Sequence, residues 1–406
     1  MEMALINSKD DPGEHIFILG YYGWKNTGDD AMLYSLLNIL DRIYPSTCFT
    51  ITTGSKIKIP ESMDNRIREV NPFQRFLFFK ALFQSSIYVL GGGTHFFDYG
   101  TRRIRIPRLL QHFLITGAMK LRGKKCYFLG IGVEKPNNWW GKFLIKNTCK
   151  MADLIVVRDS LSEETLQDMG VDTKTYQSLD LSLLLSEGIF NKDSQLNPLI
   201  NKTKKEPYLL KKDYTLDKTN LKSRVTMGVS ILPFYHIYDP KNEKDDLLVE
   251  KIARALNKWM ADSHLHHLKL FIFNGQPPHD DIQITHSLFE LLDFKNRVEI
   301  IPYNPDPLYI LNEISTCSSF IGMRYHSCLF AFINNLPLLI IDYAPKNMAM
   351  ARDVGLNSKA CISLEEVLSG GMDEKIQEIQ LNPHDFQPSL KLEEAQKKAL
   401  NWLKVL

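Results

Sequence analysis

The amino-acid sequence predicts an α/β protein made of two Rossmann-like domains that face one cleft. Short apolar runs alternate with amphipathic helical patterns in both halves of the chain, which is typical of parallel sheets flanked by helices. The 406 residues are enough for two separate hydrophobic cores. A polar stretch at residues 187–224, rich in lysine, asparagine and acidic residues, interrupts the alternation and divides the chain.

The first strand and helix enclose a loop that contains glycines. The run Ile16–Leu19 predicts a short strand, and after the loop GYYGWKNTGDD regularly spaced leucines predict a helix that ends before Pro45. The loop matches neither the dinucleotide-binding nor the P-loop pattern. Two interpretations remain open: a simple capped helix start, or a loop in which Asn26 contacts a substrate and Asp29 accepts a proton from its hydroxyl.

Three consecutive glycines follow the next predicted strand. The run Ser86–Leu90 leads into Gly91, Gly92, Gly93 and Thr94, whereas an ordinary tight turn needs only one glycine. We therefore expect Gly92, Gly93 and Thr94 to approach a ligand closely. The basic segment TRRIRIPR comes next and is either a solvated face, which we favour, or a contact for an anionic polymer or a membrane surface.

An arginine stands at the end of a later strand. Strands are expected at Lys125–Leu129 and Leu154–Val157, Arg158 follows the second, and a capping-box pattern then opens a helix over Leu161–Met169. Because the carboxyl ends of parallel strands line a cleft, Arg158 could bind an anion there. The alternative is that it pairs with the neighbouring Asp159.

From residue 225 the alternation of strands and helices resumes. Strands are expected at Val225–Ile231, Leu268–Phe273 and Val298–Ile301, and helices at Leu247–Met260, Ile282–Leu292 and Asp306–Ser315. We therefore expect an N-terminal domain over residues 1–186, a linker or insertion at 187–224 and a C-terminal domain over 225–385. A final segment over residues 386–406 should form a helix from Leu392 that packs back on the interface.

The stretch Ser318–Lys346 brings cationic and titratable side chains into one β-α-β passage. A strand, a helix and a second strand are expected at residues 319–321, 328–333 and 338–341. Arg324 and His326 then lie where a strand meets the amino end of a helix, a position suited to anions. Together with Lys346 they indicate an anionic substrate, with His326 close enough to donate a proton. The alternative is that Arg324 pairs with a nearby carboxylate while His326 caps the helix.

Composition excludes several functional classes. A formal net charge of +2 lacks the basic excess of a nucleic-acid-binding protein. The six cysteines show no C-x-x-C pair or zinc spacing, and the cluster around His266 follows a predicted helix, so we expect neither disulfides nor a metal site. The first fifteen residues lack the pattern of a signal peptide, and no run of eighteen apolar residues occurs. We therefore expect a cytoplasmic protein.

Five ordered segments carry a family resemblance: GYYGWKNTGDDAML, YVLGGGTHFFD, GIGVEKP, VVRDSLSEETLQDMGV with Asp180 downstream, and GMRYHSCLFAFINNLPLLIIDYAPK. From about Gly20 to Lys346 the chain resembles the polysaccharide pyruvyl transferase family, whose members resemble sialyltransferase-like, glycosyltransferase-B-type proteins in fold. The resemblance implies an enzyme without a cofactor. It would transfer pyruvate from phosphoenolpyruvate to a sugar of a cell-surface polysaccharide or its lipid-linked precursor, forming a ketal and releasing phosphate.

The same resemblance implies roles for individual residues. His326 is implied as the general acid, and the implied phosphoenolpyruvate ligands are Arg158, Arg324 and Lys346. Asp29 as the base for the acceptor hydroxyl is our own interpretation. Two departures from the family pattern are the residues after Asp180, where a proline and a small residue are common, and the enlarged stretch 187–224, which bears on the choice of acceptor.

The charge of the expected donor fits these residues, because phosphoenolpyruvate carries a carboxylate and a phosphate that three cations can match without a metal. Two other functions remain open. A nucleotide-sugar-dependent glycosyltransferase would need contacts to a base and ribose, for which no segment is evident, and a non-catalytic sugar-binding protein would tolerate loss of the arginines and histidine. The expected partners are phosphoenolpyruvate and a sugar or lipid-linked saccharide, which is compatible with a place at the inner face of a membrane.

Overall fold

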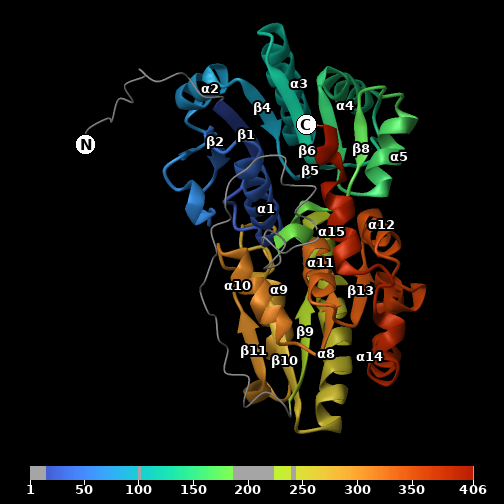
Figure 1. Cartoon of the computed structure of the whole chain (residues 1–406). Coiled ribbons are helices and arrows are strands. Elements are labelled where there is room, and N and C mark those ends of the chain that lie inside the picture. The colour runs from blue at the N-terminus through green and yellow to red at the C-terminus, as the bar shows by residue number, and fades with distance from the viewer. Residues whose placement is uncertain (1–14, 99–101, 186–223, 239–243, 406) are drawn as a thin grey trace.

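The protein consists of two α/β units, one above the other in Figure 1. The computed structural model describes residues 15–98, 102–185, 224–238 and 244–405. The expected linker or insertion at residues 187–224 therefore lies, except for Arg224, outside the described residues. The predicted α/β fold with two Rossmann-like domains is confirmed.

The first sheet is parallel, with strand order β3-β2-β1-β4-β6-β7-β8 and with β5 beside β6. Its strands are β1 (His15–Tyr22), β2 (Cys48–Thr53), β3 (Ile67–Val70), β4 (Ile87–Leu90), β5 (Gly93–Phe96), β6 (Lys125–Val133), β7 (Leu154–Val157) and β8 (Thr175–Gln177). The strand order reverses between β1 and β4, so the loops after these two strands meet at a switch point where open α/β sheets hold ligands.

Helices cover both faces of the first sheet. They are α1 (Thr27–Ile43), α2 (Arg75–Gln84), α3 (Arg102–Leu121), α4 (Trp139–Met151) and α5 (Ser160–Asp168), with the 3₁₀ turns η1 (Glu61–Met63) and η2 (Leu181–Leu185). One core contains the buried side chains of α2, α3 and α4. A separate core contains those of α1 and η2 and continues into the second domain.

The second sheet is also parallel, with strand order β11-β10-β9-β12-β13-β14 and a switch point between β9 and β12. Its strands are β9 (Val225–Ser230), β10 (His266–Phe271), β11 (Val298–Ile301), β12 (Ser319–Gly322), β13 (Leu338–Asp342) and β14 (Cys361–Ser363). Its helices are α7 (Phe234–Tyr238), α8 (Lys244–Asp262), α9 (Ile282–Glu290), α10 (Pro307–Ser315), α11 (Tyr325–Ile333), α12 (Pro345–Asp353), α13 (Leu364–Leu368), α14 (Met372–Leu381) and α15 (Leu392–Leu400). The short 3₁₀ turns are η3 (Lys295–Arg297), η4 (Ser358–Ala360), η5 (Pro383–Phe386) and η6 (Asn401–Val405).

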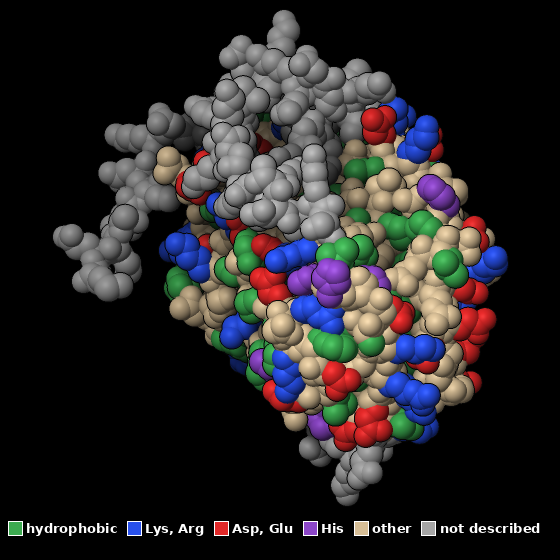
Figure 2. All heavy atoms as spheres, turned by 90° about the horizontal axis from the view of Figure 1, so that it is seen from below, with side chains coloured by type: hydrophobic (Ala, Val, Ile, Leu, Met, Phe, Trp, Pro, Cys, Tyr) green, Lys and Arg blue, Asp and Glu red, His purple; other side chains and the backbone are tan. Residues whose placement is uncertain are grey.

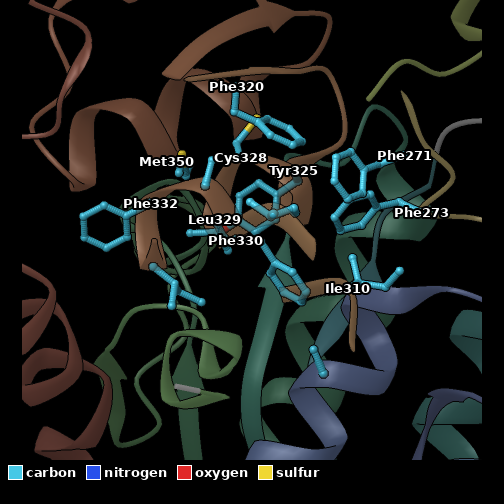
Figure 3. Close-up of a cluster of buried hydrophobic side chains, with 14 of the residues drawn as sticks. Phe271, Phe273, Ile310, Phe320, Tyr325, Cys328, Leu329, Phe330, Phe332 and Met350 are labelled. Carbon is cyan, nitrogen blue, oxygen red and sulfur yellow. The ribbon is translucent and has the colours of Figure 1, made fainter. Parts of the chain in front are cut away.

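Helix α11 is anchored in the core that the two domains share. Phe330 packs edge-on against Phe273 with 5.5 Å between the ring centroids, and Figure 3 shows both rings within the cluster around the helix. Such close packing fixes the helix axis and therefore the direction of the side chains at its amino end. Cys328 is one of four buried cysteines, as expected for a cysteine that behaves as a small hydrophobe.

The structure differs from the predicted elements in three places. Helix α11 begins at Tyr325 rather than Cys328, because its first turn carries no regular apolar pattern. The N-cap of α5 is Asp159, whose side chain accepts the N–H of Ser162, rather than Ser160 of the predicted capping box. The expected helix from Leu392 to the last residue is an α-helix only to Leu400, where η6 takes over.

The last helix, α15, contacts the first domain. The hydroxyl of Ser178 donates to the carbonyl of Ala399 at 3.1 Å, and the amide of Gln396 donates to the carbonyl of Leu183 at 3.1 Å. These buried hydrogen bonds join the end of the chain to the segment that contains Asp180. Within the part of the chain that the structure describes, no helix is long and apolar enough to cross a membrane.

Candidate functional site

The carboxyl ends of the two sheets meet at the loop between β1 and α1. The N–H of Thr27 donates to the carbonyl of Phe273 at 3.0 Å, and the N–H of Gly275 donates to the carbonyl of Lys25 at 2.8 Å. Asn26 forms a β-bridge with Asn274 between these two bonds. The loop of the first domain is therefore held by backbone hydrogen bonds against the loop after β10 of the second.

His326 lies at this junction and contacts the first domain on two sides. A Cβ atom at Gly28 would lie 1.9 Å from Nδ1 of His326, so the imidazole rests directly on the glycine backbone. Nε2 of His326 lies 3.5 Å from Oδ2 of Asp180, an ion-pair distance rather than a short hydrogen bond. The histidine thus comes from α11 of the second domain, and both neighbours come from the first.

Arg158 is buried beside the same carboxylate. Its Nη1 lies 3.7 Å from Oδ2 of Asp180, its Nη2 donates to Thr94 Oγ1 at 2.7 Å, and its Nε lies 3.3 Å from Asp159 Oδ2. The guanidinium also lies 4.5 Å from the ring centroid of Tyr325, in cation–π geometry. The guanidinium is held on several sides, which fixes a positive charge in a nearly dry site.

Burial and charge act against each other on the Asp180 and His326 side chains. Burial acts to raise the pKa of Asp180, but His326 and Arg158 outweigh it and lower that pKa to about 2. For His326, burial is the largest effect and lowers the pKa below its usual value, helped by the charges of Arg158 and Lys346 and opposed by Asp180. Without a ligand, the imidazole at neutral pH is therefore mainly uncharged beside an ionised carboxylate.

Asp29 is a second titratable group at the junction. It is buried in the first turn of α1, and a Cβ at Gly93 would lie 3.1 Å from its Oδ1. Burial, with the charges of Asp30 and Asp180, raises the pKa of Asp29 to about 8 against the opposing charges of Arg158 and Lys346. A carboxyl with this pKa exchanges protons near neutral pH, as acid–base catalysis requires.

Arg324 is engaged with a buried carboxylate. It lies at the N-cap of α11, and its Nε donates to Asp281 Oδ1 at 2.9 Å, while Nη2 also bonds Asp281 and donates to the carbonyl of His279 at 3.0 Å. The carboxylate of Asp281 is completely buried. Of the two interpretations of Arg324, the structure therefore contains the one in which it pairs with a carboxylate. That carboxylate lies 43 residues away in sequence.

Lys346 follows β13 in the first turn of α12 and is half-buried. Its Nζ lies 5.7 Å from the ring centroid of Tyr343. Lys346 forms no ion pair with any carboxylate in the described part of the chain. The ammonium group is therefore available to an anion.

The remaining predicted contacts have internal partners. Asn26 caps α1 by accepting the N–H of Gly28 at 3.1 Å. A Cβ at Gly92 would lie 2.7 Å from Met32 Sδ, so close packing against α1 already requires a glycine there. Gly93 has a φ of +123°, which favours glycine, and Thr94 holds Arg158. The glycine run therefore shapes the site from behind, next to Asp29.

The structure adds three residues to those predicted as site residues. Asp180 binds both His326 and Arg158, Tyr325 stacks on Arg158, and Asp281 holds Arg324. The local signal for Asp180 is an acidic residue in front of an apolar run, SLDLSLLL. Among the described residues, no group of three or more His, Cys, Asp or Glu side chains is arranged to hold a metal ion.

Three comparisons relate the chain to known proteins. A family model described as polysaccharide pyruvyl transferase matches residues 26–345. The search of curated proteins found no match. The matched range begins at the cap of α1 and ends at Pro345, so it contains all of the catalytic and ligand residues predicted above except Lys346, which follows it directly.

Solved structures share the architecture at low identity. A putative UDP-N-acetylglucosamine 2-epimerase from Listeria monocytogenes is 12% identical with a TM-score of 0.59, over 96% of this chain and 94% of that one. The UDP-GlcNAc 2-epimerase from Neisseria meningitidis, bound to UDP-GlcNAc, is 10% identical with a TM-score of 0.57, over 96% and 98%. Anabaena HepE, in complex with UDP and glucose, is 10% identical with a TM-score of 0.53, over 96% and 97%. At this identity the likeness establishes the GT-B-type fold alone.

Proposed function

Because the chain belongs to the polysaccharide pyruvyl transferase family, we propose that it transfers the pyruvyl group of phosphoenolpyruvate to two hydroxyls of a saccharide. The product is a pyruvate ketal, and inorganic phosphate is released. The observation that carries this proposal is the convergence of His326, Asp29 and Lys346 from both domains on one buried junction. The group provides two proton carriers and an available cation, which suit an anionic donor and a hydroxyl acceptor.

The donor anion fits the second domain. Lys346 offers an ammonium, and the amino end of α11 offers N–H groups that have no partner within the helix. Arg324, at the N-cap of α11, makes no capping bond with its side chain. We place the phosphate or carboxylate of the donor between Lys346 and Arg324, so that both positive charges would bind it.

The acceptor then approaches from the first domain, where Asp29 lies. In the first step, an acceptor hydroxyl attacks C2 of the donor, its proton passes to a base, and C3 receives a proton and becomes a methyl group. In the second step, a second hydroxyl attacks C2, the bond from C2 to the phosphate oxygen breaks, and phosphate leaves with the remaining proton. Fixed cations stabilise the departing phosphate.

His326 is proposed as the acid that protonates C3. Without a ligand its pKa is lowered by burial, so it must gain its proton when the donor binds. A phosphate dianion at contact distance favours the imidazolium strongly in a site of low dielectric. Asp180 remains ionised through this cycle and holds Nε2, so that the ring keeps one orientation.

Asp29 is proposed as the base that accepts the hydroxyl proton. Its pKa of about 8 makes it a far stronger base than an ordinary aspartate, while a useful fraction stays ionised at neutral pH. Arg158 and Lys346 lower its pKa and so favour this ionised form. We also propose Arg158 as a ligand of the donor. It would bind through those guanidinium N–H groups that do not contact Thr94 or Asp159.

Calorimetric titration of phosphoenolpyruvate into Lys346→Ala tests the donor site without breaking an ion pair. We expect binding to weaken by about 1.5 kcal/mol or more, as for loss of a charged hydrogen bond. Lys251→Ala is the matched control, because Lys251 is also half-buried but lies on α8. Arg324→Ala is the second variant, checked by thermal unfolding since it leaves Asp281 buried without its partner.

The same titration includes a panel of UDP-sugars, because solved proteins of this fold are bound to UDP-GlcNAc and to UDP-glucose. Pyruvyl transfer is supported if phosphoenolpyruvate binds, if Lys346→Ala weakens that binding, and if phosphate is released when a saccharide acceptor is added. Binding of a UDP-sugar but not of phosphoenolpyruvate would replace the proposal with nucleotide-sugar glycosyl transfer. If neither phosphoenolpyruvate nor a UDP-sugar binds, even with saccharide present, the proposed donor site does not exist.

A further inference from the structure

The helices α2, α3 and α4 give one face of the first domain an unusual composition. None of the three contains an aspartate or a glutamate, whereas they carry ten lysines and arginines. The chain as a whole is nearly balanced, with 49 basic and 47 acidic residues. Figure 2 shows the ordinary pattern on the underside of the molecule, where acidic and basic side chains are interspersed over the second domain.

The same face exposes large apolar side chains. Helix α2 buries Phe78 and Leu82 against the sheet, yet on its other side Phe76 is 78% exposed and Phe79 is 44% exposed. A helix with large apolar residues on opposite sides normally contacts protein or lipid on both of them. Neighbouring residues extend the patch, with exposed side chains at Phe73, Phe83, Leu110, Leu114, Leu121, Trp139 and Phe143.

These side chains belong to one continuous face. The buried sides of α2, α3 and α4 share one core on the same side of the sheet, and the helices lie next to one another in Figure 1. The guanidinium of Arg122, just after α3, lies 5.0 Å from the ring centroid of Phe83 on α2. We call this surface, made of the outward sides of α2, α3 and α4, the basic-apolar face.

We propose that the basic-apolar face docks on the surface of an anionic lipid bilayer. Exposed aromatic rings with lysines and arginines around them suit the headgroup region, where rings enter the interface and cations meet lipid phosphates. The attachment that we propose is peripheral, with the rings entering only the interface. Lys120 and Lys150 pair with Asp153 and Asp172 at the edge of this face, but none of the three helices carries an acidic residue of its own. A second copy of this chain fits less well, because two such faces would bring mostly like charges together.

A row of aromatic rings leads from this face to the candidate site. Phe73 contacts Trp24 edge-on with 5.9 Å between the centroids, and Trp24 stacks on Tyr21 at 5.8 Å. Tyr21 belongs to the end of β1, which leads into the loop before Asp29, and the guanidinium of Arg108 on α3 lies 6.0 Å from its ring centroid. Burial raises the pKa of its phenol, and the charge of Asp29 adds to this. We infer that the saccharide of a lipid-linked acceptor passes along these rings while its lipid remains in the bilayer, an inference that rests on the proposed function.

Vesicle co-sedimentation of the full chain tests the docking. We expect binding to phosphatidylcholine vesicles that contain phosphatidylglycerol, much weaker binding to phosphatidylcholine alone, and a decrease with salt. Phe76→Ser should weaken binding, whereas Leu381→Ser should not, since Leu381 is equally exposed at 79% but lies on α14 of the second domain. Circular dichroism establishes that both variants fold.

A second set of variants reverses single positive charges in the same vesicle assay. Lys80→Glu on α2 should weaken binding to the anionic vesicles by roughly an order of magnitude, whereas Arg254→Glu on α8 should leave it unchanged. Equal loss in both variants would mean that net charge rather than this face is responsible, and would overturn the proposal. Absence of vesicle binding combined with a dimer that Phe76→Ser dissociates would assign the face to a second copy.

Different results would refute the docking proposal and the proposed reaction. Phosphate release with a water-soluble saccharide acceptor should be unchanged in Phe76→Ser and Lys80→Glu, because neither side chain touches the candidate site. Vesicle binding without any phosphate release would leave the docking intact and count against pyruvyl transfer. Phosphate release with no difference in vesicle binding between Phe76→Ser and Leu381→Ser would leave the reaction intact and overturn the docking.

Discussion

Replacing Gly28 by alanine tests whether the position of His326 matters. The new Cβ would lie 1.9 Å from Nδ1 and 2.1 Å from Cγ of His326, whereas ordinary contacts begin near 3.4 Å. The ring must therefore retreat by about 1.5 Å, and its contact with Asp180 would be lost or remade. A displacement of about 1 Å at a catalytic group costs roughly 100-fold in rate. We expect kcat/KM for phosphate release to fall by about that factor, or about 2.7 kcal/mol.

The helix itself should tolerate the change. Gly28 lies in the first turn of α1 without a positive φ, and alanine in a helix is favoured over glycine by about 0.5–1 kcal/mol. This gain offsets part of the strain around His326, so thermal unfolding should move by only a few degrees. Gly117→Ala in α3 is the matched control, because its Cβ would meet its nearest neighbour at 3.7 Å. We expect that variant to keep full activity.

The refuting result is a Gly28→Ala enzyme that keeps kcat/KM within about threefold of the wild-type value. Histidine ring resonances in an NMR spectrum would then show whether His326 had moved. A shifted ring with full activity would mean that the imidazole takes no part in the rate-limiting proton transfer. A ring that had not shifted would mean that α1 had moved instead.

Three further predictions concern the charged groups. Asp180→Asn removes the anion that raises the pKa of His326, so NMR titration should give a still lower pKa, with a loss of stability of about 3 kcal/mol for breaking a buried pair. Asp29 has a raised pKa, so its stabilising contribution is full below its unfolded pKa near 4 and is lost as pH rises to about 8. The advantage of Asp29→Asn in thermal unfolding should therefore grow between pH 5 and pH 8; an unchanged difference would contradict the raised pKa. Arg324→Lys keeps the charge but not the two-point contact with Asp281, and should lower the unfolding temperature more than Lys251→Arg does.

Much of the fold follows from the sequence because parallel strands buried on both faces are continuous apolar runs. The strand β4 is completely buried, and its run of four apolar residues was sufficient to predict it. The strand β2, with the sequence CFTITT, was missed because its threonines interrupt the apolar run, although they are buried in the sheet. Helix α2 was missed for the opposite reason, since apolar residues on all its sides give no helical period.

The candidate site was predictable only in part. The positions of Arg324 and His326 at a strand-to-helix turn followed from local pattern, because that turn is encoded within a few residues. Their partners did not, because Asp180 and Asp281 lie 146 and 43 residues away from the side chains that they hold. A short motif specifies which way a backbone turns, but not which carboxylate from a distant part of the chain packs against it.

The division of the site between two domains has a chemical consequence. His326 belongs to the second domain, but the burial that lowers its pKa comes partly from Gly28 and Asp180 of the first. The domains are tied near this point, since the N–H of Ser160 on α5 donates to Asp353 on α12 at 3.0 Å. If the domains separated, His326 would regain solvent and lose Asp180, so its protonation would return toward that of a free histidine. The acid–base pair that the proposed reaction needs therefore exists only while the two domains are docked.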